Sequence, residues 1–203
     1  MTNNVKWNSY IERARTKANS MSYTVLKSFR SQQPGIYISL YKTYVRPLLE
    51  YNTIIWAPQS IGNLELAEKA QRSFTKRLCK KLNISFRDYE DRLKILKIES
   101  LEYRRLKTDL ILTYKIINNL IDLNIPNFFT FSQVHSIYSL RRHTLYLEKS
   151  DSTTPIRQNF FSKRIINTWN ALPNSIVTSE TLTIFKHRQT NFPLSSIHKF
   201  VFK

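Results

Sequence analysis

A cluster of basic side chains between residues 69 and 81 is the part of the sequence best suited to binding a polyanion. Successive residues of a helix are turned by about 100°, and at that spacing the cationic side chains lie within roughly half of the circumference. Apolar residues, among them Phe74 and Leu78, occupy the other side. No acidic residue lies between positions 72 and 81. The pattern favours contact with phosphates, and an ordinary solvated helix face, which commonly carries lysine, stays open as the alternative. The candidate nucleic-acid-binding residues are Lys69, Arg72, Lys76, Arg77, Lys80 and Lys81.

The charge of the whole chain indicates the same class of partner. The 203 residues include 32 Lys and Arg against 14 Asp and Glu, a formal net charge of +18. Such a protein attracts a polyanion or an anionic membrane surface. No apolar run reaches the ~18 residues of a membrane-spanning helix, and residues 1–10 lack the basic-then-apolar order of a signal peptide. We therefore expect a protein of the cytosol or nucleus that binds RNA, DNA or an RNA:DNA hybrid and no membrane.

The carboxylates at 88–91 and the single cysteine are weak candidates for catalysis. Asp88, Glu90 and Asp91 lie among basic residues just before an apolar run, and this arrangement favours capping and ion pairing at the start of a helix. Cys79 has lysines beside it in the sequence, but no histidine or asparagine in the spacing of a thiol nucleophile. An ordinary helix cysteine is the favoured interpretation.

Cofactor and metal sites are not expected. Glycine occurs only at Gly35 and Gly62, so the glycine-rich loops that bind phosphates in nucleotide folds cannot be built. The histidines are not spaced as metal ligands are; they are His135, His143, His187 and His198. We expect no resident cofactor, no small-molecule substrate and no enzymatic activity of the chain's own.

Hydrophobic periodicity predicts a mainly α protein. Apolar residues recur near a period of 3.6 residues in segments 7–29, 64–82 and 101–123, and each is expected to be a helix with one buried stripe. Segment 36–56 has the same period, but Pro47 lacks an amide hydrogen and should bend or split that helix near Val45. Trp7, Trp56 and Trp169 lie on apolar stripes, so core packing is favoured over stacking on bases. Residues 1–125 are expected to form a helical bundle.

Residues 126–203 are expected to be less regular and to pack on the bundle without forming a second domain. β-favouring residues at 144–147 predict loops or short strands. Apolar residues recur at steps of three or four over 157–172, which predicts one further amphipathic helix ended by Pro173. Thr178 or Ser179 is expected to cap a final turn or two.

Residues 40–58 and 157–173 carry the most specific motifs of the chain. The first segment has the sequence LYKTYVRPLLEYNTIIWAP, and the second has RQNFFSKRIINTWNALP, with Phe185-Lys186 after it. Between them come QRSFTKRL at 71–78, Arg92-Leu93, Arg104-Arg105 and Asp109-Leu110. In order and spacing these segments resemble the region after the catalytic palm in reverse transcriptases of LINE-type (non-LTR), jockey-like retrotransposons. The chain departs from that family's pattern at Tyr10 and at positions 22–23 and 141–143.

The resemblance implies a thumb-like helical region over 1–125 and a C-terminal extension over 126–203, which in such enzymes grip template and primer beside the palm. Polymerase chemistry of this type needs three carboxylates around two metal ions, two of them adjacent in sequence. The chain has no Asp-Asp pair, so Mg²⁺ would belong to the palm of a full-length parent. The expectation is a truncated RNA-directed DNA polymerase that holds RNA or hybrid by its phosphates. A host-adopted protein-interaction scaffold without nucleic-acid binding is the alternative.

Overall fold

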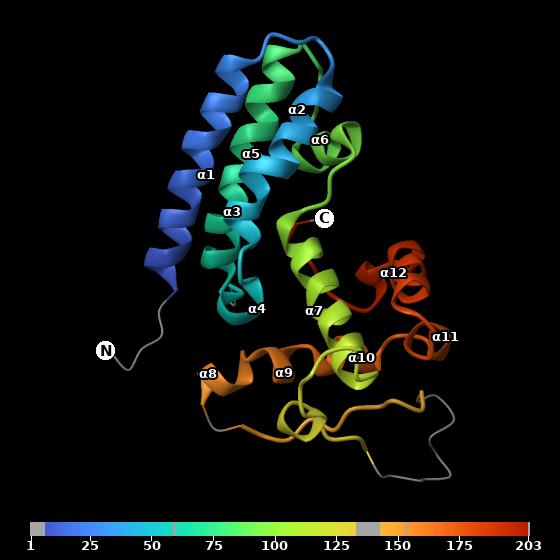
Figure 1. Ribbon diagram of the computed structural model, residues 1–203. Coiled ribbons are helices and arrows are strands. Elements are labelled where there is room, and N and C mark those ends of the chain that lie inside the picture. The colour runs from blue at the N-terminus through green and yellow to red at the C-terminus, as the bar shows by residue number, and fades with distance from the viewer. Residues whose placement is uncertain (1–6, 59, 133–142, 153, 203) are drawn as a thin grey trace. The chain divides into compact units, whose positions relative to one another are not determined.

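The computed structural model describes residues 7–58, 60–132, 143–152 and 154–202, and it is mainly α, as the periodicity predicts (Figure 1). In those ranges the β pairing amounts to one antiparallel bridge between Phe131 and Leu147. The chain divides into two compact units, Met1–Arg105 with Phe200–Lys203, and Leu106–Lys199. The boundary between the units thus falls inside α7 (Leu101–Ile117), whereas the sequence pattern changes near residue 125.

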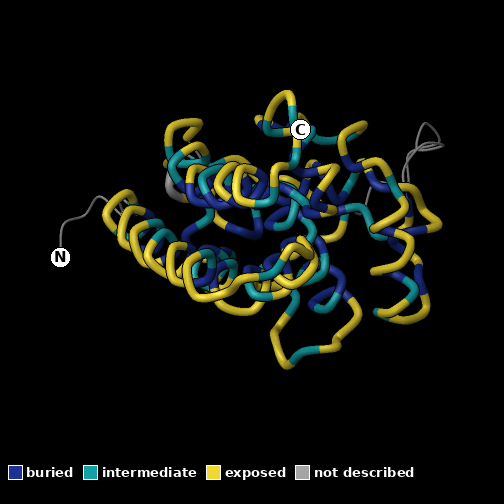
Figure 2. The backbone as a smooth tube through the Cα atoms, turned by 90° about the horizontal axis from the view of Figure 1, so that it is seen from above, coloured by how far each residue is buried: buried dark blue, intermediate teal, exposed yellow. Residues whose placement is uncertain are grey.

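The first unit is a helical bundle followed by a short helix and the start of a long one. Its elements are α1 (Asn8–Ser28), α2 (Pro34–Leu40), the π-helical turn η1 (Tyr41–Val45), α3 (Arg46–Glu50), α4 (Thr53–Trp56), α5 (Ile61–Lys81), α6 (Tyr89–Leu96) and the first turn of α7 (Leu101–Ile117). The expected helices over 7–29 and 64–82 are confirmed by α1 and α5. Figure 2 shows their amphipathic character as buried and exposed stretches that alternate along the tube.

Helices α1 and α5 run parallel to each other, and the chain returns between them through α2, η1 and α3 (Figure 1). At their N-terminal ends, the Asn63 amide donates to Asn8 Oδ1 at 2.8 Å. At their C-terminal ends, Lys81 Nζ donates to the Phe29 carbonyl at 2.7 Å. The core between them is formed by buried apolar side chains, including Val25, Tyr41, Val45, Leu49, Ala70, Phe74 and Leu78.

The regular helix expected to bend or split near Val45 is interrupted there by a π-helical turn, η1. The Arg46 amide donates to the Tyr41 carbonyl, five residues back, where an α-helix would bond four residues back. A new helical segment, α3, then begins with Pro47 in its first turn. There the missing amide hydrogen of proline removes no helical bond. The chain breaks once more at Asn52, whose φ of 54° is left-handed.

Side-chain caps fix where α5 and α6 begin. The Asn63 amide donates to Ser60 Oγ at 3.3 Å, and the Asp91 amide donates to Asp88 Oδ1 at 2.9 Å. The Arg87 amide in turn donates to Asp91 Oδ2 at 3.0 Å. The capping role expected of the 88–91 carboxylates is therefore confirmed for Asp88.

The second unit begins within α7 and continues through short elements. They are η2 (Ile125–Asn127), α8 (Pro155–Gln158), α9 (Phe161–Arg164), α10 (Ile166–Asn170), α11 (Asn174–Val177), α12 (Leu182–Asn191) and η3 (Leu194–Ser196). Helix α7 ends at Ile117, earlier than the expected residue 123, and Asn119 adopts a left-handed φ of 51°. The β-favouring residues at 144–147 contribute the bridge of Leu147 to Phe131.

The prediction of one continuous helix over 157–172 is wrong, because the segment forms three short helices, α8, α9 and α10. Phe160 has an extended backbone (φ −65°, ψ 146°), which separates α8 from α9. The break lets the Phe161 ring become buried against Phe129, with the ring centroids 5.9 Å apart. Arg164 also donates to the Asn159 carbonyl at 3.2 Å, across the break. Tertiary packing thus overrides the local period.

The predicted cap of the last long helix is wrong as well. Thr181 caps α12, because its hydroxyl accepts from the Ile184 amide at 3.2 Å. The hydroxyls of Thr178 and Ser179 are used in the preceding turn, where they donate to the carbonyls of Asn174 and Ile176, both at 2.7 Å. Helix α12 is also longer than the turn or two expected.

Two of the three tryptophans are core residues, as predicted. Trp56 in the first unit and Trp169 in the second are buried, and Trp7 is half-buried against the Tyr10 ring. No helix in the described ranges is long and apolar enough to cross a membrane.

Candidate functional site

Helix α5 brings Lys69, Lys76, Arg77 and Lys80 together on its exposed face, as the sequence predicted. Residues 69, 76 and 80 are separated by seven and four positions, so their side chains leave the helix within about 40° of one another. The row is about 16 Å long at the ~1.5 Å rise of an α-helix. These four residues are called the α5 basic face below.

The α5 basic face carries net positive charge. None of its four side chains forms an ion pair with a carboxylate in the part of the chain that the structure describes. The acidic residue of α5 nearest to it on this side is Glu65, one turn before Lys69. A cation at the C-terminal end of a helix also interacts favourably with the helix dipole. Lys80 therefore stabilises α5 whether or not it binds a ligand.

Arg72, another predicted phosphate-binding residue, is engaged inside the first unit. Its guanidinium carbon lies 4.9 Å from the ring centroid of Tyr89 and 4.5 Å from that of Phe202. The side chain is half-buried between the two rings. Cation–π contacts of this kind are strongest when water is excluded, and they hold Arg72 away from the α5 basic face.

Lys81, the last of the predicted residues, is tied to the end of α1. Its ammonium group donates to the carbonyls of Leu26 and Phe29 and lies 5.0 Å from the ring centroid of Tyr37. The last carbonyls of a helix have no partner within the helix. Lys81 therefore caps the C-terminal end of α1, and its ammonium group is engaged in these contacts.

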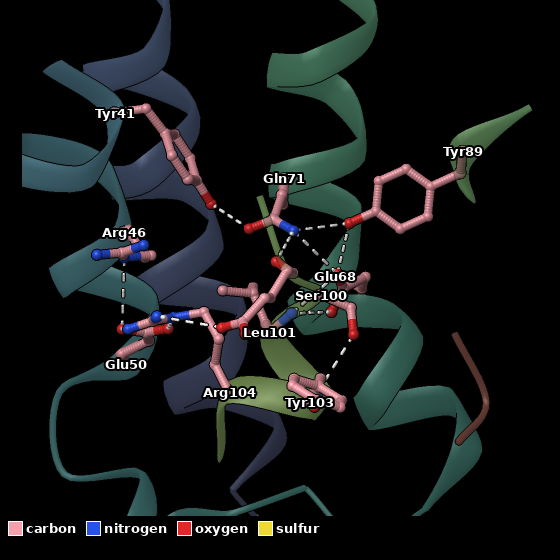
Figure 3. A network of polar contacts seen from close by, with 11 residues as sticks. Tyr41, Arg46, Glu50, Glu68, Gln71, Tyr89, Ser100, Leu101, Tyr103 and Arg104 are labelled. Carbon is pink, nitrogen blue, oxygen red and sulfur yellow. Dashed lines mark hydrogen bonds and ion pairs between the residues drawn. The ribbon is translucent and has the colours of Figure 1, made fainter. Parts of the chain in front are cut away.

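A buried polar network, which no sequence pattern predicted, lies on the inner side of α5 (Figure 3). Tyr41 donates its hydroxyl hydrogen to Gln71 Oε1 at 2.6 Å. Gln71 Nε2 donates to Tyr89 Oη at 2.9 Å and to the Glu99 carbonyl at 3.0 Å. One glutamine amide thus joins η1, α6 and the segment before α7 to α5.

Glu68 forms the acceptor end of the same network. Its carboxylate accepts from the Tyr89 hydroxyl and, through both oxygens at 3.1 Å, from the Leu101 amide at the start of α7. Burial raises the pKa of Glu68, and burial together with the Glu68 carboxylate raises the pKa of Tyr89 well above its usual range. Tyr89 therefore remains a hydrogen-bond donor at any physiological pH. Because Glu68 and Gln71 are fully buried, the network positions helices and does not meet a solute.

The two sequence motifs also contribute structural contacts. In the first unit, Glu50 of the 40–58 motif accepts from Arg104, with Arg104 Nη2 3.0 Å from Glu50 Oε2. Arg46 lies 3.6 Å from the same carboxylate oxygen. The VRP-x-LEY residues and the Arg-Arg pair of α7, far apart in sequence, thus meet at one ion cluster.

The second motif is anchored in the same way within the second unit. Arg164 donates to both carboxylate oxygens of Asp109, at 2.9 and 3.1 Å. The Trp169 indole donates to the Leu145 carbonyl at 2.9 Å, and the Asn170 amide exchanges two hydrogen bonds with the backbone of Leu147, at 2.9 and 2.8 Å. The opposite charges of the Asp-Leu and FF-x-x-R motifs were the one sequence signal for such a pairing.

The other residues weighed for chemistry are in structural surroundings. Cys79 is buried, and burial raises the pKa of its thiol. His143 is buried with Nε2 3.2 Å from the Trp169 carbonyl, and burial lowers its pKa. His135 lies outside the described residues. Among those described, no group of three His, Cys, Asp or Glu side chains could hold a metal ion, so the residues present do not fit the Mg²⁺ site of a polymerase palm.

Comparison with known proteins shows a weak similarity at the level of sequence. No family model matches the chain, and no solved structure matches it. The chain is similar to an uncharacterized protein of Caenorhabditis elegans, with 28% identity over 102 residues, which are 50% of this chain and 52% of the relative. The chain thus spans about half the length of the curated relative that it matches. The name of that relative assigns no activity, so the function must be argued from the residues.

Proposed function

We propose that this chain is a nucleic-acid-holding fragment of a LINE-type RNA-directed DNA polymerase, without a polymerase centre of its own. The observation that carries the proposal is the α5 basic face, a row of exposed cations on one rigid helix with no carboxylate paired to it in the described part of the chain. The net charge of +18 acts in the same direction. RNA or an RNA:DNA hybrid is the proposed ligand, in the cytosol or nucleus.

The chemistry of the face favours phosphates over bases. Between Lys69 and Lys80 its exposed groups are ammonium and guanidinium ions. Lysine binds phosphate as a mobile point charge, whereas base recognition needs amides, aromatic rings or arginine forks aimed at base edges. Binding should therefore depend strongly on salt and only weakly on sequence.

The ancestry part of the proposal is supported by the contacts between motif segments. Glu50 with Arg104, and Asp109 with Arg164, each join two segments that resemble the retrotransposon family independently. Ion pairs between such segments are expected if the whole set of motifs specifies one fold. Reading the in-frame DNA upstream of Met1 tests the ancestry, because a LINE-type parent requires a palm with its paired aspartates there.

The experiment that tests binding is the salt dependence of affinity for single-stranded RNA and for RNA:DNA hybrid. If the four side chains of the α5 basic face each neutralise one phosphate, log K should fall against log salt with a slope of about −3 to −4, at ~0.7–0.9 per contact. Replacing Lys69, Lys76 and Lys80 with glutamine should flatten the slope by about 2 to 3, and glutamine is a comparable helix former.

The matched control removes the same charge elsewhere on the first unit. Lys17, Lys42 and Lys94 are exposed and lie on α1, η1 and α6, so their replacement by glutamine changes the net charge equally. The control variant should keep the parental slope. Equal slopes in the two triple variants, with helicity verified by circular dichroism, would show that the α5 basic face is only a solvated surface.

A host-adopted protein-interaction scaffold is the second candidate, and exposed apolar side chains favour it. Tyr51, Ile55 and Ile61, around α4 and the start of α5, are each more than 60% exposed. Large exposed apolar groups often mark contact surfaces for other proteins. Under this alternative, RNA binding is absent at physiological salt, and a protein partner binds saturably with little dependence on salt.

A further inference from the structure

Residues 200–202, with the sequence Phe-Val-Phe, lie on the first unit with a bend at Val201. Phe200 and Phe202 are buried, at 7% and 6% exposure, whereas Val201 between them is 42% exposed. The two phenylalanine side chains therefore face the first unit, and the valine between them faces away from it. The segment belongs to no helix or strand, so its order comes from what it contacts.

The contacts to its backbone come from a buried carboxylate. Glu102 accepts from two successive amides, that of Val201 at 2.9 Å and that of Phe202 at 3.0 Å. Ser100 Oγ lies 3.5 Å from the Phe202 carbonyl. A carboxylate that accepts from consecutive backbone N–H groups forms charge-assisted hydrogen bonds, which are stronger than neutral ones. They hold the main chain where it bends at Val201, whatever its side chains.

The contacts to its side chains select aromatic rings. The Phe202 ring lies against the Arg72 guanidinium, which also contacts the Tyr89 ring. The Phe200 ring packs against Tyr103, with centroids 5.2 Å apart and planes inclined at 43°. Peptide-binding domains combine hydrogen bonds to the ligand's main chain, which give affinity, with pockets for alternate side chains, which give specificity. The contacts of Phe200 and Phe202 show the same combination.

We propose that Arg72, Ser100, Glu102 and Tyr103 form a peptide-binding site for aromatic-x-aromatic segments that bend at the middle residue, and that residues 200–202 are its ligand in cis. The whole of Leu106–Lys199 lies between the site and this ligand in the sequence. The segment is therefore tethered to the site by a long connection and is not part of a helix that forms it. The site accounts for the position of Arg72, which the α5 basic face does not use.

The test is binding of a fluorescein-labelled synthetic peptide with the sequence of residues 198–203. A full chain carrying Phe200→Ala and Phe202→Ala should bind this peptide saturably. The intact chain should bind it about tenfold more weakly, because its own segment competes at an effective concentration on the order of 1 mM. Glu102→Gln, added to the double variant, should weaken binding about tenfold, since a neutral acceptor replaces a charged one. A peptide with alanine in place of its second phenylalanine is the control and should not bind.

Absence of saturable binding by the folded double variant, or equal binding of the control peptide, would overturn the proposal. If the double variant does not fold, hydrogen exchange in the intact chain decides. The amides of Val201 and Phe202 should exchange about fivefold faster or more when ~5 mM peptide displaces the segment, as the effective concentration implies. Unchanged exchange of these two amides would show that the segment is a fixed part of the first unit.

Discussion

Replacing Trp169 with alanine should destabilise the second unit more than almost any other single truncation. The indole is fully buried, its ring centroid lies 6.2 Å from those of both Phe185 and His143, and its Nε1 donates to the Leu145 carbonyl at 2.9 Å. Truncating a buried aromatic residue costs about 3–5 kcal/mol through lost burial and the cavity left behind. Because small domains are stable by only about 5–15 kcal/mol, Trp169→Ala should bring the second unit close to unfolding at room temperature.

Urea unfolding followed by far-ultraviolet circular dichroism measures this loss, and Trp169→Phe is the matched control. Phenylalanine keeps a ring in the core but cannot donate to Leu145, so it should cost clearly less, about 1–3 kcal/mol. Trp7 and Trp56, both in the first unit, report by fluorescence whether that unit unfolds with the second. A loss below about 0.5 kcal/mol for Trp169→Ala would mean that the WNALP segment does not pack in solution as it does here.

Further predictions concern ion pairing, titration, thiol reactivity and catalysis. Arg164→Ala should lower the free energy of unfolding by about 3 kcal/mol in urea titrations, because it leaves the Asp109 carboxylate buried without its bidentate partner. Burial lowers the folded-state pKa of His143 below its ordinary value of 6.5. As pH falls below about 6.5 the unfolded chain is therefore protonated first, and the free energy of unfolding should decrease. His143→Gln should show a flatter dependence of stability on pH between about pH 5 and 7, and an unaltered slope would contradict this role of His143. Cys79 should not react with a thiol reagent at pH 8 until the chain is unfolded in denaturant, since it is buried and its pKa is raised. Primer extension on a primed RNA template with Mg²⁺ or Mn²⁺ should be absent for the purified chain, for want of the three-carboxylate site.

The elements that sequence predicted well are those governed by local physics. The 3.6-residue period of α1 and α5 is a property of each segment alone, and the effect of Pro47 follows from its missing amide hydrogen. The helix predicted over 157–172 is interrupted because Phe160 has an extended backbone. That conformation is explained by the packing of Phe161 against Phe129, which is distant in sequence, and not by any local preference. Hydrophobic periodicity cannot predict the ends of short helices that are set by tertiary contacts.

The candidate site shows the same division between local and distant causes. The angle between residues on a helix places Lys69, Lys76 and Lys80 on one face, and the structure has them there. The same rule cannot reveal that Arg72 is held by Phe202 or that Lys81 caps α1. Those partners are remote in sequence. A lysine or arginine that binds carbonyls or rings within the protein cannot be distinguished in the sequence from one that binds phosphate.

The return of residues 200–202 to the first unit has a consequence for the order in which the chain acquires its structure during synthesis. Until residue 202 has left the ribosome, the Glu102 carboxylate lacks the two amides that it accepts from and Arg72 lacks one of its two rings. The helices of the first unit can assemble while Leu106–Lys199 is still being translated, but its surface around Arg72 and Glu102 stays unfinished throughout that interval. A nascent chain therefore displays, for as long as the second unit takes to emerge, a hydrophobic and charged surface that residues 200–202 later cover.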